Sequence, residues 1–369
     1  MEPKLIFTTE ASGAVERIIE ELKPEKIAVI ADSNTACLCL SRVKALKDLP
    51  VIVNEAGEGH KNLETVQTVW EWMLALGLKR NDLVINIGGG VVTDLGGFCA
   101  ATFKRGVNFT NIPTTLLADV DASFGGKTGF DFGGVKNLIG VFANPWETII
   151  SPEFLDTLPE QEIKSGLGEM LKHVLLGGRA ENLVQFETIA DRGFLSLASE
   201  ERLAMIEASV EVKKRIVESD PFEKGPRKAL NLGHTAGHAI EALMLEKGSP
   251  VPHGYAVGWG LVVALVMSRL RFGSLSLCKE NGNRHHIGGE SDLLYYTLPL
   301  IRNIFGTPSV DCKDFDRLMQ LMASDKKNIR QGEVSFTLLS AIGEPQTDCR
   351  AMEKDIREAM EIACDLLGS

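Results

Sequence analysis

The stretch Asp82-Leu-Val-Ile-Asn-Ile87 runs directly into Gly88-Gly89-Gly90 and then into a helix that we expect to begin near Thr93 and Asp94. The apolar run predicts a buried strand. Glycines at its end permit positive φ and let backbone N–H groups approach an anion at a helix N-terminus, where a pyrophosphate is the natural ligand. A triple glycine without the GxGxxG spacing also serves as a plain tight turn, so on its own it leaves both interpretations open.

Similar units surround this stretch in the first half of the chain. Short β-rich runs alternate with segments of helical periodicity, which is typical of a parallel sheet covered by helices. Pro113-Thr114-Thr115 would lie at the same sheet edge as the glycines, and Asp32, at the end of its own strand, could bind ribose hydroxyls. We predict strands at 26–32, 50–53, 82–87, 109–112 and 147–150, and helices at 15–22, 35–46, 64–76 and 93–102.

The pattern changes after Pro159 to longer segments with a period near 3.6 residues. The second half is therefore expected to be mostly helical, with one strand at 334–340 and a Gly-, Asn- and His-rich loop at 279–291. These observations predict two domains, residues 1–158 and 159–369. The helical segments lie at 161–176, 181–192, 198–219, 229–246, 254–270, 313–323 and 351–367.

The composition excludes several classes of partner. The 369 residues include 39 Lys and Arg against 50 Asp and Glu, a net charge of −11, so no general basic field exists for nucleic acid or an anionic membrane. The apolar run 256–267 is too short for the ~20 residues of a membrane span and predicts a buried helix. The first ten residues lack the apolar core of a secretory signal, and the seven cysteines form no CxxC pair, so we expect a cytoplasmic protein without a thiolate zinc site.

Histidines and a glutamate in the second half suggest a metal site. His234 and His238 are four residues apart on one helical face, and His253 stands at the start of the next predicted helix. Glu169 offers a carboxylate on an earlier helix, with His173 four residues after it. Three such ligands with an open position describe a catalytic divalent-metal site. The spacing leaves two assignments open: Glu169 paired with His173, or Glu169 with His234 and His253.

Eight motifs, in order and with matching spacing, are similar to those of the 3-dehydroquinate synthase family of sugar phosphate cyclases. The resemblance covers about residues 25 to 345 and is weakest between 271 and 310. The motifs are Gly88-Gly-Gly-Val-Val-Thr-Asp94, Ala101-Thr-Phe-Lys-Arg105-Gly, Pro113-Thr-Thr-Leu-Leu-Ala118, Asp121-Ala-Ser-Phe-Gly-Gly-Lys127, Gly134-Val-Lys136-Asn137, Ser165-Gly-Leu-Gly-Glu169-Met-Leu-Lys172-His, Leu230-Asn231-Leu-Gly-His234-Thr-Ala-Gly-His238 and Asp325-Lys326-Lys327-Asn328.

The resemblance implies a Rossmann-like, NAD-binding α/β domain, a mostly α-helical C-terminal domain and an active site in the cleft between them. It assigns Zn²⁺ or Co²⁺ to Glu169, His234 and His253, with His173 as a packing neighbour and His238 in the site without binding metal. For NAD it points to Asp32, Asn34, Glu58, Lys61, Gly89, Gly90, Asp94, Thr114, Thr115, Leu117, Asp121, Lys127, Lys136, Phe154, Thr157, Leu158 and Gln161, and it puts Asp121 and Lys127 close to the substrate as well.

The implied substrate, 3-deoxy-D-arabino-heptulosonate 7-phosphate, has a carboxylate and a phosphate that an acidic protein must meet with discrete cations. By resemblance Lys213 and Arg227 suit the carboxylate, because guanidinium binds a carboxylate with two parallel hydrogen bonds. Arg105, Asn231, His238 and Lys326, or Lys327 in its place, suit the phosphate, and Lys127, Lys172 and Asn137 complete the set. In the family the arginine that matches Arg105 comes from the partner subunit, which implies a homodimer.

The implied reaction is an oxidation at C5 by NAD, elimination of phosphate, return of the hydride, ring opening and an intramolecular aldol closure to 3-dehydroquinate. NAD would then be catalytic and not consumed. Three alternatives compete: a sister cyclase of the 2-deoxy-scyllo-inosose or epi-valiolone synthase type, a net dehydrogenase of the glycerol type, and a metal-stabilised binding protein without turnover. Lys213 with Arg227 favours the carboxylate-bearing substrate over the first, and Asp121 to Lys127 argues against the second.

Overall fold

The computed structural model describes residues 4–122, 125–179, 181–221, 223–275, 292–324 and 333–368. The chain divides into two compact units, which we describe separately. One comprises Met1–Pro159 and Leu197–Val210, and the other comprises Glu160–Ser196 and Glu211–Ser369. The loop predicted at 279–291, Lys326 and Lys327 lie outside the described residues.

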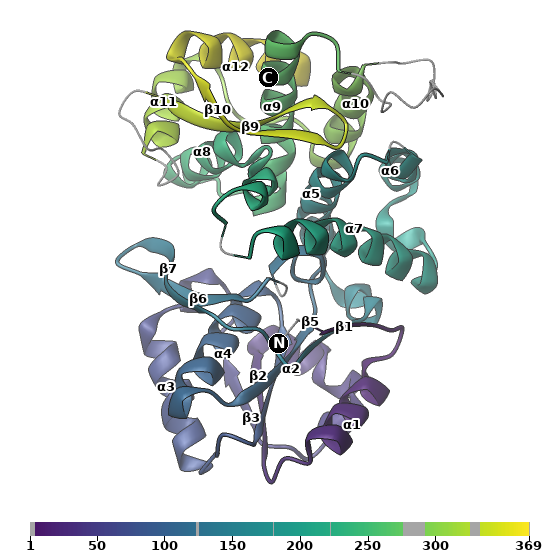
Figure 1. The fold of residues 1–369 in the computed structure, drawn as a ribbon, viewed down its shortest axis with the longest axis vertical. Helices are drawn as coiled ribbons and strands as arrows, with labels where there is room; N and C mark the ends of the chain where they lie inside the picture. The colour runs from purple at the N-terminus through teal and green to yellow at the C-terminus, as the bar shows by residue number, and fades with distance from the viewer. Residues whose placement is uncertain are drawn as a thin grey trace. The chain divides into compact units, whose positions relative to one another are not determined.

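The first unit is built on a six-stranded, fully parallel sheet (Figure 1), as the alternating pattern predicts. All five predicted strands form. One short edge strand, β1, was not predicted. In spatial order the strands are β1 (Lys4–Phe7), β8 (Glu147–Ile150), β5 (Asn108–Pro113), β4 (Leu83–Gly88), β2 (Ile27–Asp32) and β3 (Val51–Asn54).

Helices cover both faces of this sheet, which is why its central strands β2 and β4 are nearly continuous apolar runs. Along β2, Ala28 and Ile30 pack into one core with α3 (Leu63–Ala75) and α4 (Gly90–Thr102). The alternate residues Val29 and Ala31 pack into a second core with α1 (Ala11–Leu22). The predicted helix 35–46 is wrong in its second part: α2 ends early (Ser33–Leu38), and two short 3₁₀ turns (Leu40–Arg42 and Lys44–Leu46) follow. Between them the buried Val43 adopts extended backbone.

A β-hairpin that the sequence pattern did not predict follows β5. Its strands are β6 (Lys127–Phe132) and β7 (Val135–Phe142), antiparallel and joined at Gly133-Gly134, whose φ angles are +60° and +78°. A two-residue Gly-Gly connection with positive φ is a favoured hairpin turn. Before the hairpin, Ala118–Ala122 forms one π-helical turn.

The second unit is mostly helical, as predicted. The one predicted strand is confirmed as β9 (Val334–Ala341), which pairs with the unpredicted, polar β10 (Glu344–Ala351). The unpredicted α10 (Leu293–Phe305) precedes them. The other helices are α5 (Glu160–Gly177), α6 (Glu181–Arg192), α8 (His234–Glu246), α9 (His253–Phe272), α11 (Phe315–Ala323) and α12 (Glu353–Leu367). The helix α7 (Ser199–Ser219) is shared: its residues up to Val210 belong to the first unit, and those from Glu211 belong to the second.

Helix α9 is the central helix of this unit and contacts α5, α8, α10, α12 and β9. The buried helix predicted at 256–267 is confirmed, since every residue of that run is buried. By length and composition α9 could also cross a membrane, but 72% of its apolar window is buried in the protein. The helix predicted at 229–246 is wrong at its start: Pro226–Asn231 is a 3₁₀ turn, and Gly233, at φ +77°, separates it from α8.

Candidate active site

Close backbone contacts between α5, α8 and α9 build the metal-ligating part of the site. A Cβ on Gly168 would lie 2.2 Å from the backbone oxygen of Gly254, and one on Gly260 would lie 2.0 Å from the backbone oxygen of Gly233. The three helices can therefore touch only because these positions are glycine. Since Glu169 follows Gly168 and His253 precedes Gly254, the contact brings their side chains together.

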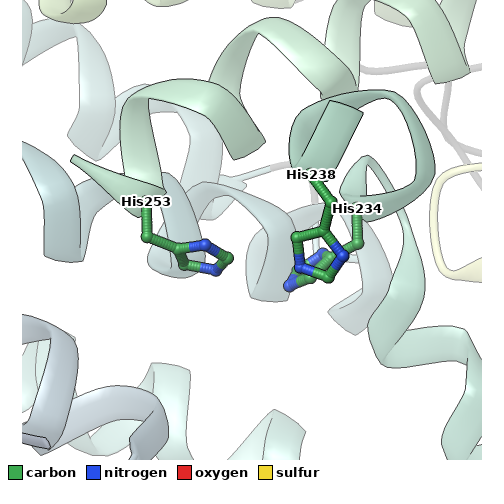
Figure 2. Close-up of side chains that lie close together, drawn as sticks. All are labelled: His234, His238 and His253. Atoms are coloured by element: carbon green, nitrogen blue, oxygen red, sulfur yellow. The ribbon is translucent and has the colours of Figure 1, made fainter. Parts of the chain in front are cut away.

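Glu169 is the fully buried centre of this group. Its Oε1 lies 3.3 Å from Nε2 of His234 and 3.4 Å from Nε2 of His253, and its Oε2 contacts the ammonium of Lys172. Figure 2 shows the rings of His234, His238 and His253 pointing toward one another, and their centroids are 5.2 to 5.7 Å apart.

The other nitrogen of each of the two closest histidines is already engaged. Nδ1 of His234 lies 3.1 Å from the backbone oxygen of Leu232, and Nδ1 of His253 lies 3.0 Å from Oε2 of Glu241. Both partners are acceptors, so each Nδ1 is the protonated nitrogen that donates the hydrogen bond. This leaves each Nε2 directed at the Glu169 carboxylate.

The buried groups of the site have strongly shifted pKa values. Burial favours the neutral acid of Glu169, but the charge of Lys172 holds its pKa well below the ordinary value. Burial, followed by the Lys172 charge, lowers the pKa of His234 to about 4, so its imidazole is neutral. For His253 burial opposes the charge, yet hydrogen bonds to Glu169 and Glu241 outweigh it and raise the pKa to about 9.

The residues present fit a divalent metal. Ligand atoms bound tetrahedrally at ~2.0–2.1 Å lie about 3.3 Å apart, which matches the separations of 3.3 and 3.4 Å between Glu169 and the two imidazole nitrogens. One carboxylate and two imidazoles are also a common catalytic zinc set. The His234, His238 and His253 side chains likewise offer ring nitrogens within 4.8 Å of one another, so His238 lies beside this set. His173, one turn after Glu169 on α5, is fully buried.

Two cations of the second unit that the sequence predicts in the site are buried. Lys213 is 5% and Arg227 is 3% exposed. Asp220 folds the loop before Arg227, because its carboxylate accepts hydrogen bonds from the backbone N–H groups of Lys224, Gly225 and Arg227. Nη1 of Arg227 donates to the backbone oxygen of Pro221 at 2.7 Å. Asn231 ends the 3₁₀ turn that begins just before Arg227.

In the first unit, the glycine loop lies at the point where the strand order reverses. The chain continues from β2 to the edge strand β3 and then returns to β4 on the other side of β2. Open α/β sheets bind ligands at such a point, outside the carboxyl ends of the strands. Asp32 ends β2 and caps α2, accepting hydrogen bonds from the backbone N–H groups of Asn34 and Thr35.

Other predicted cofactor residues gather around the glycines. A Cβ on Gly89 would lie 3.0 Å from Cγ2 of Thr115, and one on Gly90 would lie 3.1 Å from Cβ of Ala122. The segment after β5 therefore packs directly on the glycine loop, and a side chain at Gly89 would require Thr115 to shift by a few tenths of an ångström. The predicted residues Thr114, Leu117 and Asp121 belong to the same segment, with Thr114 buried and the other two half-buried.

A buried lysine connects α4 with the hairpin. Nζ of Lys61 lies 2.6 Å from Oδ2 of Asp94 and 2.6 Å from Oδ1 of Asn137. Two predicted cofactor residues and one predicted substrate residue thus meet, although they are far apart in the sequence. The other predicted residues of this unit differ in exposure: Arg105, Lys127, Lys136 and Glu58 are exposed, Phe154 is buried in a core, and Thr157 and Leu158 follow it. Gln161 belongs to α5 of the second unit.

Family models match almost all of the segment that carries these sites. The model for the N-terminal part of 3-dehydroquinate synthase matches residues 51–165, and the model for its C-terminal part matches residues 166–328. The chain belongs to the 3-dehydroquinate synthase family. The family predicted from the sequence motifs is therefore confirmed, and with it the class of enzyme, a lyase.

Curated relatives agree with the 3-dehydroquinate synthase family, and solved structures share the fold. The 3-dehydroquinate synthase of Parabacteroides distasonis is 37% identical over 100% of this chain and 99% of its own length. That of Clostridium tetani is 35% identical over 90% and 84%. A 2-epi-5-epi-valiolone synthase of Streptomyces hygroscopicus, solved with NAD⁺ and Zn²⁺, has TM-score 0.80 at 24% identity, covering 99% of this chain and 97% of its own. A 2-deoxy-scyllo-inosose synthase solved with carbaglucose-6-phosphate, NAD⁺ and Co²⁺ has TM-score 0.79 at 22% identity, over 96% and 95%.

Two residues that hold site residues in place, Glu241 and Asp220, were not predicted from the sequence. Glu241 lies seven residues after His234 on the same face of α8, a helical spacing that could have suggested it. Asp220 lies seven residues before Arg227 in an irregular loop, and no periodic signal marks its hydrogen bonds to that loop.

Proposed function

We propose that this chain converts 3-deoxy-D-arabino-heptulosonate 7-phosphate to 3-dehydroquinate and phosphate, with Glu169, His234 and His253 as ligands of Zn²⁺ or Co²⁺. The observation that carries the proposal is the convergence of two Nε2 atoms on one oxygen of the buried Glu169, at 3.3 and 3.4 Å. When bound, the metal acts as a Lewis acid on the substrate's hydroxyl oxygens. Membership in the 3-dehydroquinate synthase family supplies the reaction.

NAD is proposed to bind at the carboxyl ends of β2 and β4. The support is the strand reversal, the side-chain-free glycine loop and its packing against Thr115. Backbone N–H groups at the start of α4 face the pyrophosphate in this arrangement. Sister cyclases of the same fold have been solved with NAD⁺ bound together with Zn²⁺ or Co²⁺.

The substrate-binding residues form two groups, one for the carboxylate of the substrate and one for its phosphate. Arg227, held by its bond to Pro221, presents a guanidinium to the substrate carboxylate together with Lys213. Arg105, Asn231, His238 and Lys326 or Lys327 hold the phosphate. Lys172 keeps Glu169 ionised, and the substrate's own phosphate accepts the C6 proton as it leaves, so the protein chiefly supplies position and charge.

Oligomeric state and cellular location are part of the same proposal. We propose a homodimer in which Arg105, exposed at a turn with φ of +67°, enters the partner's site. The cytoplasm is the proposed compartment, in line with the acidic composition and the absence of a CxxC pair. No nucleic acid or membrane is expected as a partner.

Substrate identity is tested at the carboxylate pocket. Arg227→Ala removes a buried, charge-assisted partner of the carboxylate, so we expect a loss of ~2–5 kcal/mol of transition-state binding, or roughly 30-fold to several-thousand-fold in kcat/KM for phosphate release. Affinities for NAD and metal should stay the same. The exposed Arg215, on α7, provides the control variant Arg215→Ala, which should keep the wild-type rate.

The comparison substrate is a heptulose or hexose phosphate without the carboxylate. The wild type should turn it over poorly, and Arg227→Ala should lose its preference for the heptulosonate. An unchanged rate of Arg227→Ala on the heptulosonate phosphate, or a wild-type preference for the substrate without the carboxylate, would move the chain to a sister cyclase activity.

A further inference from the structure

Helix α8 carries three polar side chains of the site on one face. His234, His238 and Glu241 follow one another at intervals of four and three residues, so they lie along a single line of the helix. Glu241 points across to α9, where its Oε2 accepts the hydrogen bond from Nδ1 of His253 at 3.0 Å. None of the motifs singled out in the sequence uses Glu241.

We propose that Glu241 is the positioning residue that orients His253 for metal binding, an inference that rests on the proposed metal site. His253 is the first residue of α9, so its ring projects from a helix end, and its side chain is 30% exposed compared with 12% for His234. The ring of His234 is fixed by a backbone carbonyl, whereas that of His253 is fixed by the Glu241 carboxylate. The hydrogen bond holds the proton on Nδ1 and directs Nε2 at Glu169.

The contact between Glu241 and His253 is not required to hold α8 against α9. The glycine contacts already join these helices, since a Cβ on Gly260 would meet the backbone oxygen of Gly233 at 2.0 Å and one on Gly237 would meet that of Ala256 at 2.9 Å. Glu241 is also 21% exposed, so it does not belong to the fully buried core of the unit. Its distinctive contribution is to the ring of His253, whose basicity as a ligand a carboxylate partner increases.

The test measures metal affinity in the full-length protein. Glu241→Ala and Glu241→Gln are compared with the wild type by competition for Zn²⁺ against a chromophoric chelator, and by the visible absorption spectrum of the Co²⁺ form. Loss of such a hydrogen-bond partner typically costs about 10- to 100-fold in metal affinity, and we expect Glu241→Ala to fall in this range with an altered Co²⁺ spectrum. Glu241→Gln keeps an oxygen acceptor and should lie between Glu241→Ala and the wild type.

Glu246→Gln is the matched control, because Glu246 is on the same helix and pairs with Arg317 at the surface. It should bind Zn²⁺ as the wild type does. The melting temperatures of the metal-free proteins show that the variants are folded. Wild-type Zn²⁺ affinity and an unchanged Co²⁺ spectrum in Glu241→Ala would overturn the inference. If His253→Ala also binds Zn²⁺ as tightly as the wild type, the proposed metal site itself is wrong.

Discussion

The carboxylate of Glu169 is the negative charge that attracts cations to the site. It is fully buried, and Lys172, His234 and His253 all surround it. Burying a carboxylate costs free energy unless a positive charge is paired with it. If the present partners are removed, binding of another cation beside Glu169 is therefore strongly favourable. Without metal, the proton on His253 and the Lys172 ammonium meet this need, and a divalent ion replaces the proton.

Metal content distinguishes the two assignments that the sequence leaves open. His234→Ala and His253→Ala should each lose stoichiometric Zn²⁺, because each removes a nitrogen that faces Glu169. His173→Ala and His238→Ala should retain it. The measurement is elemental analysis of the purified variants after dialysis. An empty His173→Ala together with a full His253→Ala would show that the ligand set is wrong.

The contact between α5 and α9 depends on glycine more than on any side chain. A Cβ on Gly254 would lie 1.7 Å from the backbone oxygen of Ser165, a collision that only a shift of the two helices can relieve. We expect Gly254→Ala to destabilise the protein by at least the ~1–3 kcal/mol typical of overpacking, and to weaken Zn²⁺ binding because Glu169 and His253 move apart. Denaturant unfolding and chelator competition measure the two effects.

Gly13 gives the matched control for this substitution. It lies within α1, and no atom would lie within 4 Å of an added Cβ. Gly13→Ala should leave Zn²⁺ affinity unchanged and stabilise the protein by about 0.5–1 kcal/mol, the ordinary gain of alanine over glycine in a helix. A Gly254→Ala variant as stable as Gly13→Ala would contradict the packing argument.

The loop 220–227 should depend on pH through Asp220. Backbone hydrogen bonds from Lys224, Gly225 and Arg227 lower the pKa of Asp220 in the folded protein. A lowered folded pKa means that its contribution to loop stability is present above the unfolded value of ~3.9 and is lost as the pH falls through the folded value. Asp220→Asn should therefore speed amide hydrogen exchange of this loop at neutral pH, with a difference that shrinks below about pH 4.

Asp348→Asn is the control for the loop experiment. Asp348 is exposed and pairs with Lys228 next to the loop, so its loss removes a nearby charge without removing a loop hydrogen bond. Exchange in residues 224–227 should stay at the wild-type rate in that variant. A difference between Asp220→Asn and the wild type that persists unchanged at acid pH would mean that the ionised carboxylate is not what holds the loop.

Elements with a strong periodic pattern could be predicted, and those set by partners could not. The buried strands β2 and β4 are mostly apolar on both faces, so their runs stand out in the sequence. In β7 the apolar run 138–142 is exposed and pairs only with β6, so it lacks the flanking pattern of a buried sheet strand, and β10 is a polar strand of a two-stranded sheet. Similarly, the helical spacing of His234 and His238 indicates in the sequence that they share a face. The contact of Glu241 with His253 forms only when α8 packs on α9, so the sequence pattern does not predict it.

Across the whole molecule, the cofactor and metal candidates belong to different units. The glycine loop and the Lys61–Asp94–Asn137 group are in the unit built on the parallel sheet, and Glu169, His234 and His253 are in the helical unit. The proposed chemistry requires both sets to act on one substrate. A hydride taken from the substrate must be returned to a later intermediate, which separates this enzyme from a net dehydrogenase.

The most direct measurement of the central claim is turnover with a single equivalent of NAD per active site. Phosphate released from 3-deoxy-D-arabino-heptulosonate 7-phosphate is followed together with NADH absorbance, in the Zn²⁺-loaded protein. The account predicts many equivalents of phosphate per bound NAD with no steady rise in NADH. Phosphate release that stops after one equivalent, or NADH that accumulates in step with substrate consumption, would contradict it.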